Sequence, residues 1–400
     1  MTVLERVRSG AALLGPAFVA AIAYVDPGNV ATNTAAGARY GYLLVWVLVA
    51  ANVMAGLVQY LSAKLGLVTG KSLPEAVRDR LPRRGRLAYW AQAEVVAMAT
   101  DLAEVLGGAI ALNLLFGLPL LLGGVVTGAV STVLLLVQDR RGQRPFERVI
   151  TGLLLVVAIG FAAGLVVAPP SGAVVGGLVP RFAGPDSVLL AAGMLGATVM
   201  PHAVYLHSAL TRDRHGRAPH LLRSTRVDVV VAMVLAGAVN LAMLLLAASA
   251  LGGRSDVDTL EGVHAAIGQQ LGGGVAVLFA IGLLASGFAS TAVGCYSGAV
   301  VLDGLLRRRI PLTTRRLVTL VPALVVLALG VDPTLALVLS QVVLSFGIPF
   351  ALVPLVWLTA RRSVLGAHAN HRATTVAAVL VAAAVIALNG ALVWLTVAGG

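Results

Sequence analysis

The sequence predicts an all-α integral membrane protein of eleven helices. Three observations support this fold class: 58% of the 400 residues are hydrophobic, only 12% are charged, and apolar runs of membrane length recur from end to end. Such a composition excludes a soluble enzyme. The net charge of +12 would suggest nucleic-acid binding in a soluble protein. Here the basic residues are sorted by loop, so they report orientation in the membrane and no nucleic-acid partner is expected.

The spans follow from the apolar runs, each of which must be long enough to cross about 30 Å of hydrocarbon. We predict a single transmembrane domain over residues 1–400. Glycine pairs such as Gly294 with Gly298 fit close packing of membrane helices without a chemical role. The eleven predicted spans lie near residues 11–36, 43–64, 89–115, 118–137, 149–168, 188–209, 228–250, 272–301, 317–330, 336–358 and 374–397.

Lysine and arginine are concentrated in every second loop. Of the 29 Lys and Arg residues, 26 precede span 1 or follow spans 2, 4, 6, 8 and 10, which all end on the same side of the membrane. The other three are Arg39, Arg181 and Arg254. The positive-inside rule then predicts a cytoplasmic N-terminus and, with eleven spans, an extracytoplasmic C-terminus. Arg6 and Arg8 before an apolar run imitate a secretory signal, but we expect no cleavage, because it would remove half of span 1.

Two spans are interrupted near their middle. Asp26-Pro27-Gly28-Asn29 breaks span 1, and Met200-Pro201-His202 breaks span 6. Proline removes a backbone donor and glycine permits an unwound backbone, which membranes tolerate only beside protein or a water-filled cavity. A proline in a span is often only a kink. The mid-membrane carboxylate of Asp26 favours a functional break, since burying an unpaired charge there costs several kcal/mol.

The breaks lie five helices apart, and a five-helix displacement reverses the direction of crossing. This spacing predicts an inverted repeat of spans 1–5 and 6–10, about residues 11–168 and 188–358, with an extra helix at about 374–397. Transporters built in this way bind substrate at the midplane, between two discontinuous helices.

The residue types at the breaks indicate a divalent transition metal. Asp26 and Asn29 offer oxygen ligands, and unwound backbone near Ala23 and Ala197 could offer carbonyls. Oxygen alone suits Mg²⁺, Ca²⁺ or Mn²⁺, whereas the thioether of Met200 favours softer ions, so the set favours Mn²⁺ or Fe²⁺. Taken alone, a methionine in a membrane helix is usually a packing residue.

A second group of charges lies in span 3. Glu94, Asp101 and Glu104 fall within about 80° of one another on a helix, and such a stripe inside a span must face the bundle or water. The apolar run of span 9 is too short to cross, so we expect its helix to begin earlier and to bring Arg315 and Arg316 against this stripe.

His202 lies beside the second break, and the ordinary pKa of histidine suits proton transfer. A lone histidine is more often a satisfied core residue. We hypothesise that metal binding displaces a proton from Asp26, or that a proton leaves separately through His202, Glu104 and Asp101 toward the two arginines and the cytoplasm.

These motifs resemble the Nramp family of metal transporters, in particular its bacterial manganese importers. The resemblance covers roughly residues 11–360 and rests on five stretches. They are Asp26-Pro27-Gly28-Asn29, Met200-Pro201-His202, Thr100-Asp101-Leu102-Ala103-Glu104, Gly142-Gln143-Arg144-Pro145 and Ser340-Gln341-Val342-Val343-Leu344-Ser345.

The resemblance implies a LeuT-like fold and proton-coupled uptake of Mn²⁺, with Fe²⁺, Co²⁺ and Cd²⁺ as further substrates, across a bacterial cytoplasmic membrane. It implies no resident cofactor and no obligatory protein partner besides the lipid bilayer. Met200 distinguishes the chain from magnesium-transporting relatives. By matching motif, the metal ligands would be Asp26, Asn29, Met200, the carbonyls of Ala23 and Ala197, and Gln341. The proton route would comprise Asp26, His202, Glu104, Asp101, Glu94, His207, Arg315 and Arg316.

Three other classes of protein fit the sequence less well than a metal transporter. A symporter of amino acids or organic ions could share the architecture, but it would not need Asp, Asn and Met together at the breaks. An intramembrane metallohydrolase would require a motif such as His-Glu-x-x-His, which the sequence does not contain. A purely structural membrane protein has no reason to carry Asp26.

Overall fold

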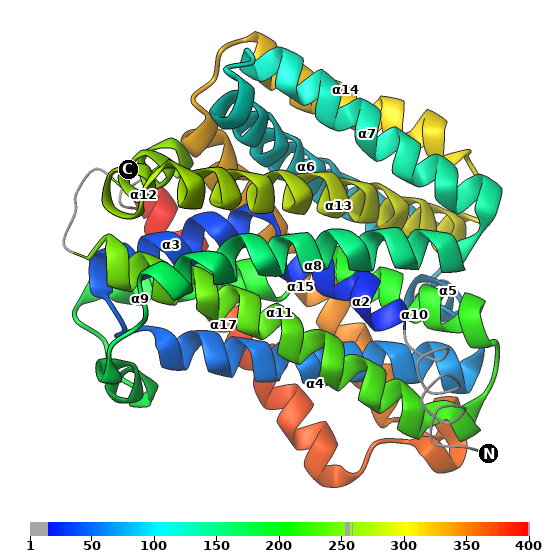
Figure 1. Cartoon of the computed structure of the whole chain (residues 1–400). Helices are drawn as coiled ribbons and strands as arrows, with labels where there is room; N and C mark the ends of the chain where they lie inside the picture. The colour runs from blue at the N-terminus through cyan, green and yellow to red at the C-terminus, as the bar shows by residue number, and fades with distance from the viewer. Residues whose placement is uncertain (1–14, 253–256, 258, 399–400) are drawn as a thin grey trace, which may run out of the picture.

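The computed structural model describes residues 15–252, 257 and 259–398, and within these ranges the regular elements are all helices. Figure 1 shows the long helices running side by side, with the short segments α2 and α3 in the middle of the bundle. The start of predicted span 1, with Arg6 and Arg8, lies outside the described residues, as does Arg254.

The helices follow the apolar runs, but several extend past them into polar sequence. Helix α6 begins at Arg83, before the predicted residue 89, because backbone hydrogen bonding can continue where the chain leaves the hydrocarbon. The main helices are α2 (Pro16–Ala21), α3 (Pro27–Tyr40), α4 (Val45–Thr69), α6 (Arg83–Phe116), α7 (Leu120–Arg141), α8 (Gln143–Val167), α9 (Pro185–Thr198), α10 (Pro201–His215), α11 (Leu222–Ala250), α13 (Gly273–Leu306), α14 (Leu312–Ala328), α15 (Pro333–Ala360) and α17 (Arg372–Ala398).

Shorter helices lie between these elements. They are η1 (Ile22–Val25), α5 (Leu73–Arg78), η2 (Gly172–Leu178), η3 (Pro219–Leu221), α12 (Leu260–Leu271), α16 (Arg362–Leu365) and η4 (Gly366–His368). Helix α2 begins and α17 ends at opposite ends of the bundle in Figure 1, as an odd number of crossings requires.

Within the described residues, nine helices are long and apolar enough to cross a membrane, counting α9 and α10 as one crossing. The other two predicted spans fall short for physical reasons. Span 1 is divided at Asp26 into α2, η1 and α3, and α14 has only 17 residues. The prediction that this helix starts before its apolar run is confirmed, because α14 begins at Leu312.

The two interrupted spans cross at the centre. Helix α2 packs against α10, and α3 packs against α9, so each half of one broken span meets the opposite half of the other. Around them lie α4, α6, α11, α13 and α15. The residues from Gly15 to Val30 are buried except Phe18, which is half-buried. The breaks are therefore enclosed by protein on the side of α2, as irregular backbone at membrane depth requires.

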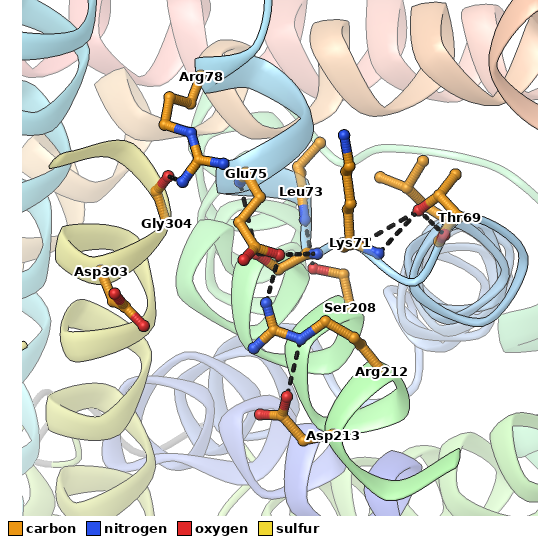
Figure 2. A network of polar contacts seen from close by, with 12 residues as sticks. Thr69, Lys71, Leu73, Glu75, Arg78, Ser208, Arg212, Asp213, Asp303 and Gly304 are labelled. Carbon is orange, nitrogen blue, oxygen red and sulfur yellow. Dashed lines mark hydrogen bonds and ion pairs between the residues drawn. The ribbon is translucent and has the colours of Figure 1, made fainter. Parts of the chain in front are cut away.

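Most lysines and arginines lie at one end of the bundle, which we call the cation-rich end; it contains α5 and the C-terminal ends of α4 and α10. Polar contacts bind α5 to its neighbours there (Figure 2). The Glu75 carboxylate pairs with Arg212 of α10, and the backbone N–H of Leu73 donates to the Ser208 hydroxyl at 2.8 Å. Arg78 donates to the carbonyl of Gly304 in α13 at 3.0 Å.

Candidate functional site at the two helix breaks

The first break is an N-cap in the middle of a span. Asp26 has an extended backbone (φ −68°, ψ 170°), and its carboxylate accepts the backbone N–H of Asn29 at 2.8 Å, which begins α3. Pro27 occupies the first helical position, where its missing N–H costs nothing. The local sequence thus ends one helix and begins another while fixing the carboxylate at the start of α3.

The second break has the same construction without a side-chain cap. Helix α9 ends at Thr198, Val199 and Met200 have non-helical backbones, and Pro201 starts α10. Met200 is fully buried at the N-cap position, and the carbonyl of Ala197 belongs to the last turn of α9. The N-cap residues of α3 and α10, Asp26 and Met200, are therefore both residues predicted as metal ligands.

Asn29 joins the two breaks. Its side-chain Nδ2 donates to Asp26 Oδ1 at 2.7 Å and to the carbonyl of Ala197 at 3.0 Å, across 168 residues of sequence. Asp26 and Asn29 are at most 1% exposed, and Asn29 Oδ1 is buried without a hydrogen-bond partner among the described residues. A carboxylate and a carbonyl, both acceptors, thus converge on one polar group in a buried site, with an unused amide oxygen beside them.

Gln341 of α15 lies against the first break. A β-carbon added to Gly28 would lie 2.6 Å from Gln341 Nε2 and 3.4 Å from Asp26 Oδ2, so the absent side chain of Gly28 is what admits the amide. The Nε2 atom of Gln341 is buried and has no partner among the described residues. The structure therefore brings Gln341 to the same place as Asp26 and Asn29.

A cavity of about 260 Å³ leads to this place from the other, cation-poor end. Ala197 and Gln341 line its inner part, and Arg39 and Asp186 line it near the ends of α3 and α9. On the opposite side, α2 is held by Asp228 of α11, whose carboxylate accepts the backbone N–H groups of Gly15 and Ala17 at 3.1 Å each. The cavity thus reaches the edge of the site from the cation-poor end, at Ala197 and Gln341, while Asp26 and Asn29 themselves are buried.

Two polar residues support the unwound backbone, and sequence reasoning missed both. Asn240 Nδ2 donates to the carbonyl of Tyr24 at 2.7 Å, and Ser286 Oγ donates to the carbonyl of Val25 at 2.6 Å. The available signal was an asparagine and a serine within strongly apolar spans. They satisfy carbonyls that the break would otherwise leave unpaired.

The predicted pairing of span 3 with span 9 is confirmed. Arg315 Nη2 lies 2.8 Å from Glu94 Oε1, and Arg316 pairs with Asp101 through its Nη1. Arg316 is fully buried and Asp101 is 1% exposed. Thr291 of α13 donates to Asp101 Oδ1 at 2.8 Å, which completes a buried ion pair between α6, α13 and α14.

Glu104 connects this stripe with the first break. Both of its carboxylate oxygens are buried without hydrogen-bond partners in the described structure. One turn further along α6, Gly107 contacts the ring of Pro27, so this face of α6 is turned toward the break. Glu104 therefore lies between the metal-site candidates and the ion pairs.

The glycines of α13 accommodate these charges. A β-carbon on Gly294 would lie 2.7 Å from Glu104 Oε2, and one on Gly298 would overlap the guanidinium of Arg315. The prediction that this pair serves close packing agrees with the structure, which adds that the groups approaching the glycines are charged side chains of α6 and α14 that a larger residue would exclude.

The two histidines differ in their surroundings. His202 is 3% exposed, and neither ring nitrogen has a hydrogen-bond partner among the described residues. His207 contacts Gln59 of α4 through Nδ1 at 2.7 Å, and Gln59 in turn donates to the hydroxyl of Tyr24 at 2.5 Å. His207 is thus directed to α4, away from the stripe on α6, while its predicted role in proton transfer stays a prediction.

These features define a class: a helical membrane transporter with two broken helices around a buried polar site. Comparison with known proteins gives the family. The family described as "Natural resistance-associated macrophage protein-like" (Nramp) matches residues 17–395, and the chain belongs to it. The chain is 64% identical over 394 residues to the "Divalent metal cation transporter MntH" of Mycobacterium tuberculosis, and the alignment covers 97% of this chain and 92% of that protein. The protein of the same name from Deinococcus radiodurans is 50% identical, with 95% and 89% covered.

Solved structures agree with this assignment. The manganese transporter of Eremococcus coleocola has a TM-score of 0.89 at 31% identity, covering 98% of this chain and 88% of that one. The nucleobase-cation-symport-1 transporter MHP1 has a TM-score of 0.62 at 16% identity, covering 94% and 91%. At that identity the second likeness concerns the fold alone. The predicted LeuT-like fold, the Nramp family and a transporter rather than an enzyme are confirmed; the residue roles stay predictions.

Proposed function

We propose that this chain imports divalent transition metal ions, chiefly Mn²⁺ and also Fe²⁺, Co²⁺ and Cd²⁺, by alternating access with coupled protons. The names of the similar proteins support divalent metal transport. The observation that carries the proposal is the convergence of Asp26, Asn29 and the Ala197 carbonyl, with Met200 at the facing N-cap.

The chemistry of the convergence suits a divalent cation. In the structure, one neutral NH₂ group satisfies both Asp26 Oδ1 and the Ala197 carbonyl. A dehydrated cation placed among these oxygens would be held by the same acceptors, and rotation of the Asn29 amide would add its unpaired oxygen. The thioether of Met200 supplies the soft ligand, and Ala23 and Gln341 complete the proposed set.

The direction of transport follows from the two ends of the bundle. The cavity reaches the site from the cation-poor end, while α2 and α5 close the cation-rich end. With the cation-rich end in the cytoplasm, as the positive-inside rule predicts, this conformation faces outward. We assign the chain to a bacterial cytoplasmic membrane, with a cytoplasmic N-terminus and an extracytoplasmic C-terminus.

The proton route is proposed to begin at Asp26 and His202 and to run along α6. Glu104 stands next, with two oxygens free to accept a proton, followed by Asp101 with Arg316 and by Glu94 with Arg315 at the cation-rich end. Because α14 carries both arginines, metal and proton would leave the midplane by separate paths. His207 forms a branch toward α4.

The test is uptake into proteoliposomes, with Mn²⁺ compared with Mg²⁺ across an imposed pH gradient. Asp26→Asn should abolish Mn²⁺ uptake, because it removes the negative charge from the proposed ligand set. Glu261→Gln, a carboxylate change on α12, is the matched control and should transport normally. Mn²⁺ uptake retained by Asp26→Asn would refute the ligand assignment.

A second measurement follows proton entry with a pH-sensitive dye inside the vesicles. Glu104→Gln should reduce proton movement more than Mn²⁺ binding, since this side chain lies between the break and the ion pairs. Equal loss of both would argue against separate paths.

A further inference from the structure

A pocket of about 680 Å³ lies at the cation-rich end, apart from the proposed metal site. It is formed where α6 begins, α13 ends and α14 begins. Its lining includes Arg83, Leu87, Trp90, Arg308, Arg315 and Val318. The pocket thus combines arginines with apolar side chains at the depth where a membrane helix leaves the hydrocarbon.

The pocket is lined by more positively charged side chains than negatively charged ones. Four arginines line it against one glutamate, and Glu94 is already paired with Arg315 at 2.8 Å. Arg83 and Arg308 come from different segments, are exposed, and have no charged or hydrogen-bond partner among the residues described. Their guanidinium groups are donors suited to a phosphate.

An unsatisfied donor lies in the same wall. The indole Nε1 of Trp90 is buried and has no hydrogen-bond acceptor in the described structure. Buried donors are ordinarily paired. Because Nε1 is enclosed by protein while other atoms of Trp90 line the pocket, this donor becomes available to an acceptor in the pocket only when the indole turns outward.

The apolar part of the pocket continues along the outside of the bundle. Leu87 is 45% exposed and Val318 is 54% exposed, and both line the pocket. Val95 on α6 and Leu317 on α14 continue this apolar surface, at 57% and 63% exposure. A small anion in water would not need this surface, whereas an acyl chain would lie along it.

We propose that the pocket binds one anionic phospholipid of the adjacent leaflet. Its phosphate would accept hydrogen bonds from Arg83 and Arg308, and its acyl chains would lie against Leu87 and Val318. Basic pockets between membrane helices are suited to such headgroups. The lipid lies directly beside the Glu94–Arg315 pair, so this site adjoins the end of the charged stripe without replacing either partner.

The experiment uses Trp90 as the probe. With Trp46, Trp357 and Trp394 replaced by Phe, fluorescence is measured in nanodiscs containing brominated phosphatidylglycerol or brominated phosphatidylcholine at equal mole fraction. Phosphatidylglycerol should quench more strongly. Arg83→Gln with Arg308→Gln should lower this preference about 25-fold, since each arginine near an anionic headgroup contributes about fivefold.

The matched control changes Arg140→Gln with Arg141→Gln, which removes two exposed arginines of α7 from the same end of the bundle. It should keep the preference. Native mass spectrometry of the chain with all four tryptophans should show the same order of lipid retention. Equal quenching by both lipids, or an equal loss of the phosphatidylglycerol preference in both double variants, would overturn the proposal. It would also be overturned if soluble glycerol phosphate prevented the quenching of Trp90 as effectively as unbrominated phosphatidylglycerol.

Discussion

The buried pair of Arg316 with Asp101 gives the sharpest quantitative prediction. Arg316 is 0% and Asp101 1% exposed, so Arg316→Met leaves an uncompensated carboxylate inside the bundle. Breaking a buried pair in this way costs about 3–5 kcal/mol, whereas replacing both partners by apolar residues is often neutral. Arg316→Met should therefore destabilise the protein strongly, and Asp101→Leu in the same chain should restore most of the loss.

The assay is thermal unfolding in detergent, followed by intrinsic fluorescence, for the native chain, both single variants and the double variant. At about 2 °C for each kcal/mol, Arg316→Met should unfold about 6–10 °C lower. Arg307→Met, an exposed arginine before α14, is the control and should unfold near the native temperature. If Arg316→Met unfolds like the native chain, or the double variant loses as much as the two singles together, the ion pair is not a coupled buried unit.

Three further predictions concern the site and the cation-rich end. Met200→Ala should weaken competition by Cd²⁺ in Mn²⁺ uptake by about tenfold, equivalent to about 1.4 kcal/mol, while competition by Mg²⁺ stays unchanged; parallel changes for both ions would refute a thioether ligand. Gly28→Ala should abolish uptake but keep the fold, because its β-carbon would lie 2.6 Å from Gln341 Nε2; normal Mn²⁺ uptake would show that Gln341 can withdraw freely. Burial alone would raise the pKa of Glu75, but hydrogen bonds from Ser72 and the charge of Arg212 outweigh it and hold the pKa below 4.5. The stability difference between the native chain and Glu75→Gln, about 1 kcal/mol for this half-exposed pair, should therefore persist above about pH 5 and vanish as the pH falls below 4.5; a difference that grows in acid would contradict this assignment.

The sequence predicted those parts of the fold that depend on hydropathy and backbone chemistry. Proline directly after a capping aspartate favours the start of a new helix, so the break at Asp26 could be placed without coordinates, whereas Pro322, Pro349 and Pro354 lie inside continuous helices. The early start of α14 was predictable as well, because an apolar run of some 15 residues cannot cross the bilayer and the nearest extension contains Arg315 and Arg316.

Contacts between segments far apart in the chain were less predictable from the sequence. The hydrogen bonds from Asn240 and Ser286 depend on how α11 and α13 are placed beside η1, and no local pattern records that placement. The interpretation of Gly294 was incomplete for a related reason: small residues indicate that something approaches closely, but the sequence does not say whether it is a backbone or a carboxylate. Gln341 was suggested only by family resemblance.

The shortness of α14 has a consequence for the surrounding bilayer. Seventeen residues at 1.5 Å each reach about 26 Å, less than the roughly 30 Å of a typical hydrocarbon layer. Its first five residues also include Arg315 and Arg316, whose side chains are buried against α6, so thinning of the adjacent lipid or entry of water there would relieve the hydrophobic mismatch. Membrane thickness thus becomes a variable of transport, and thicker bilayers should slow the protein by disfavouring hydration beside the charged stripe.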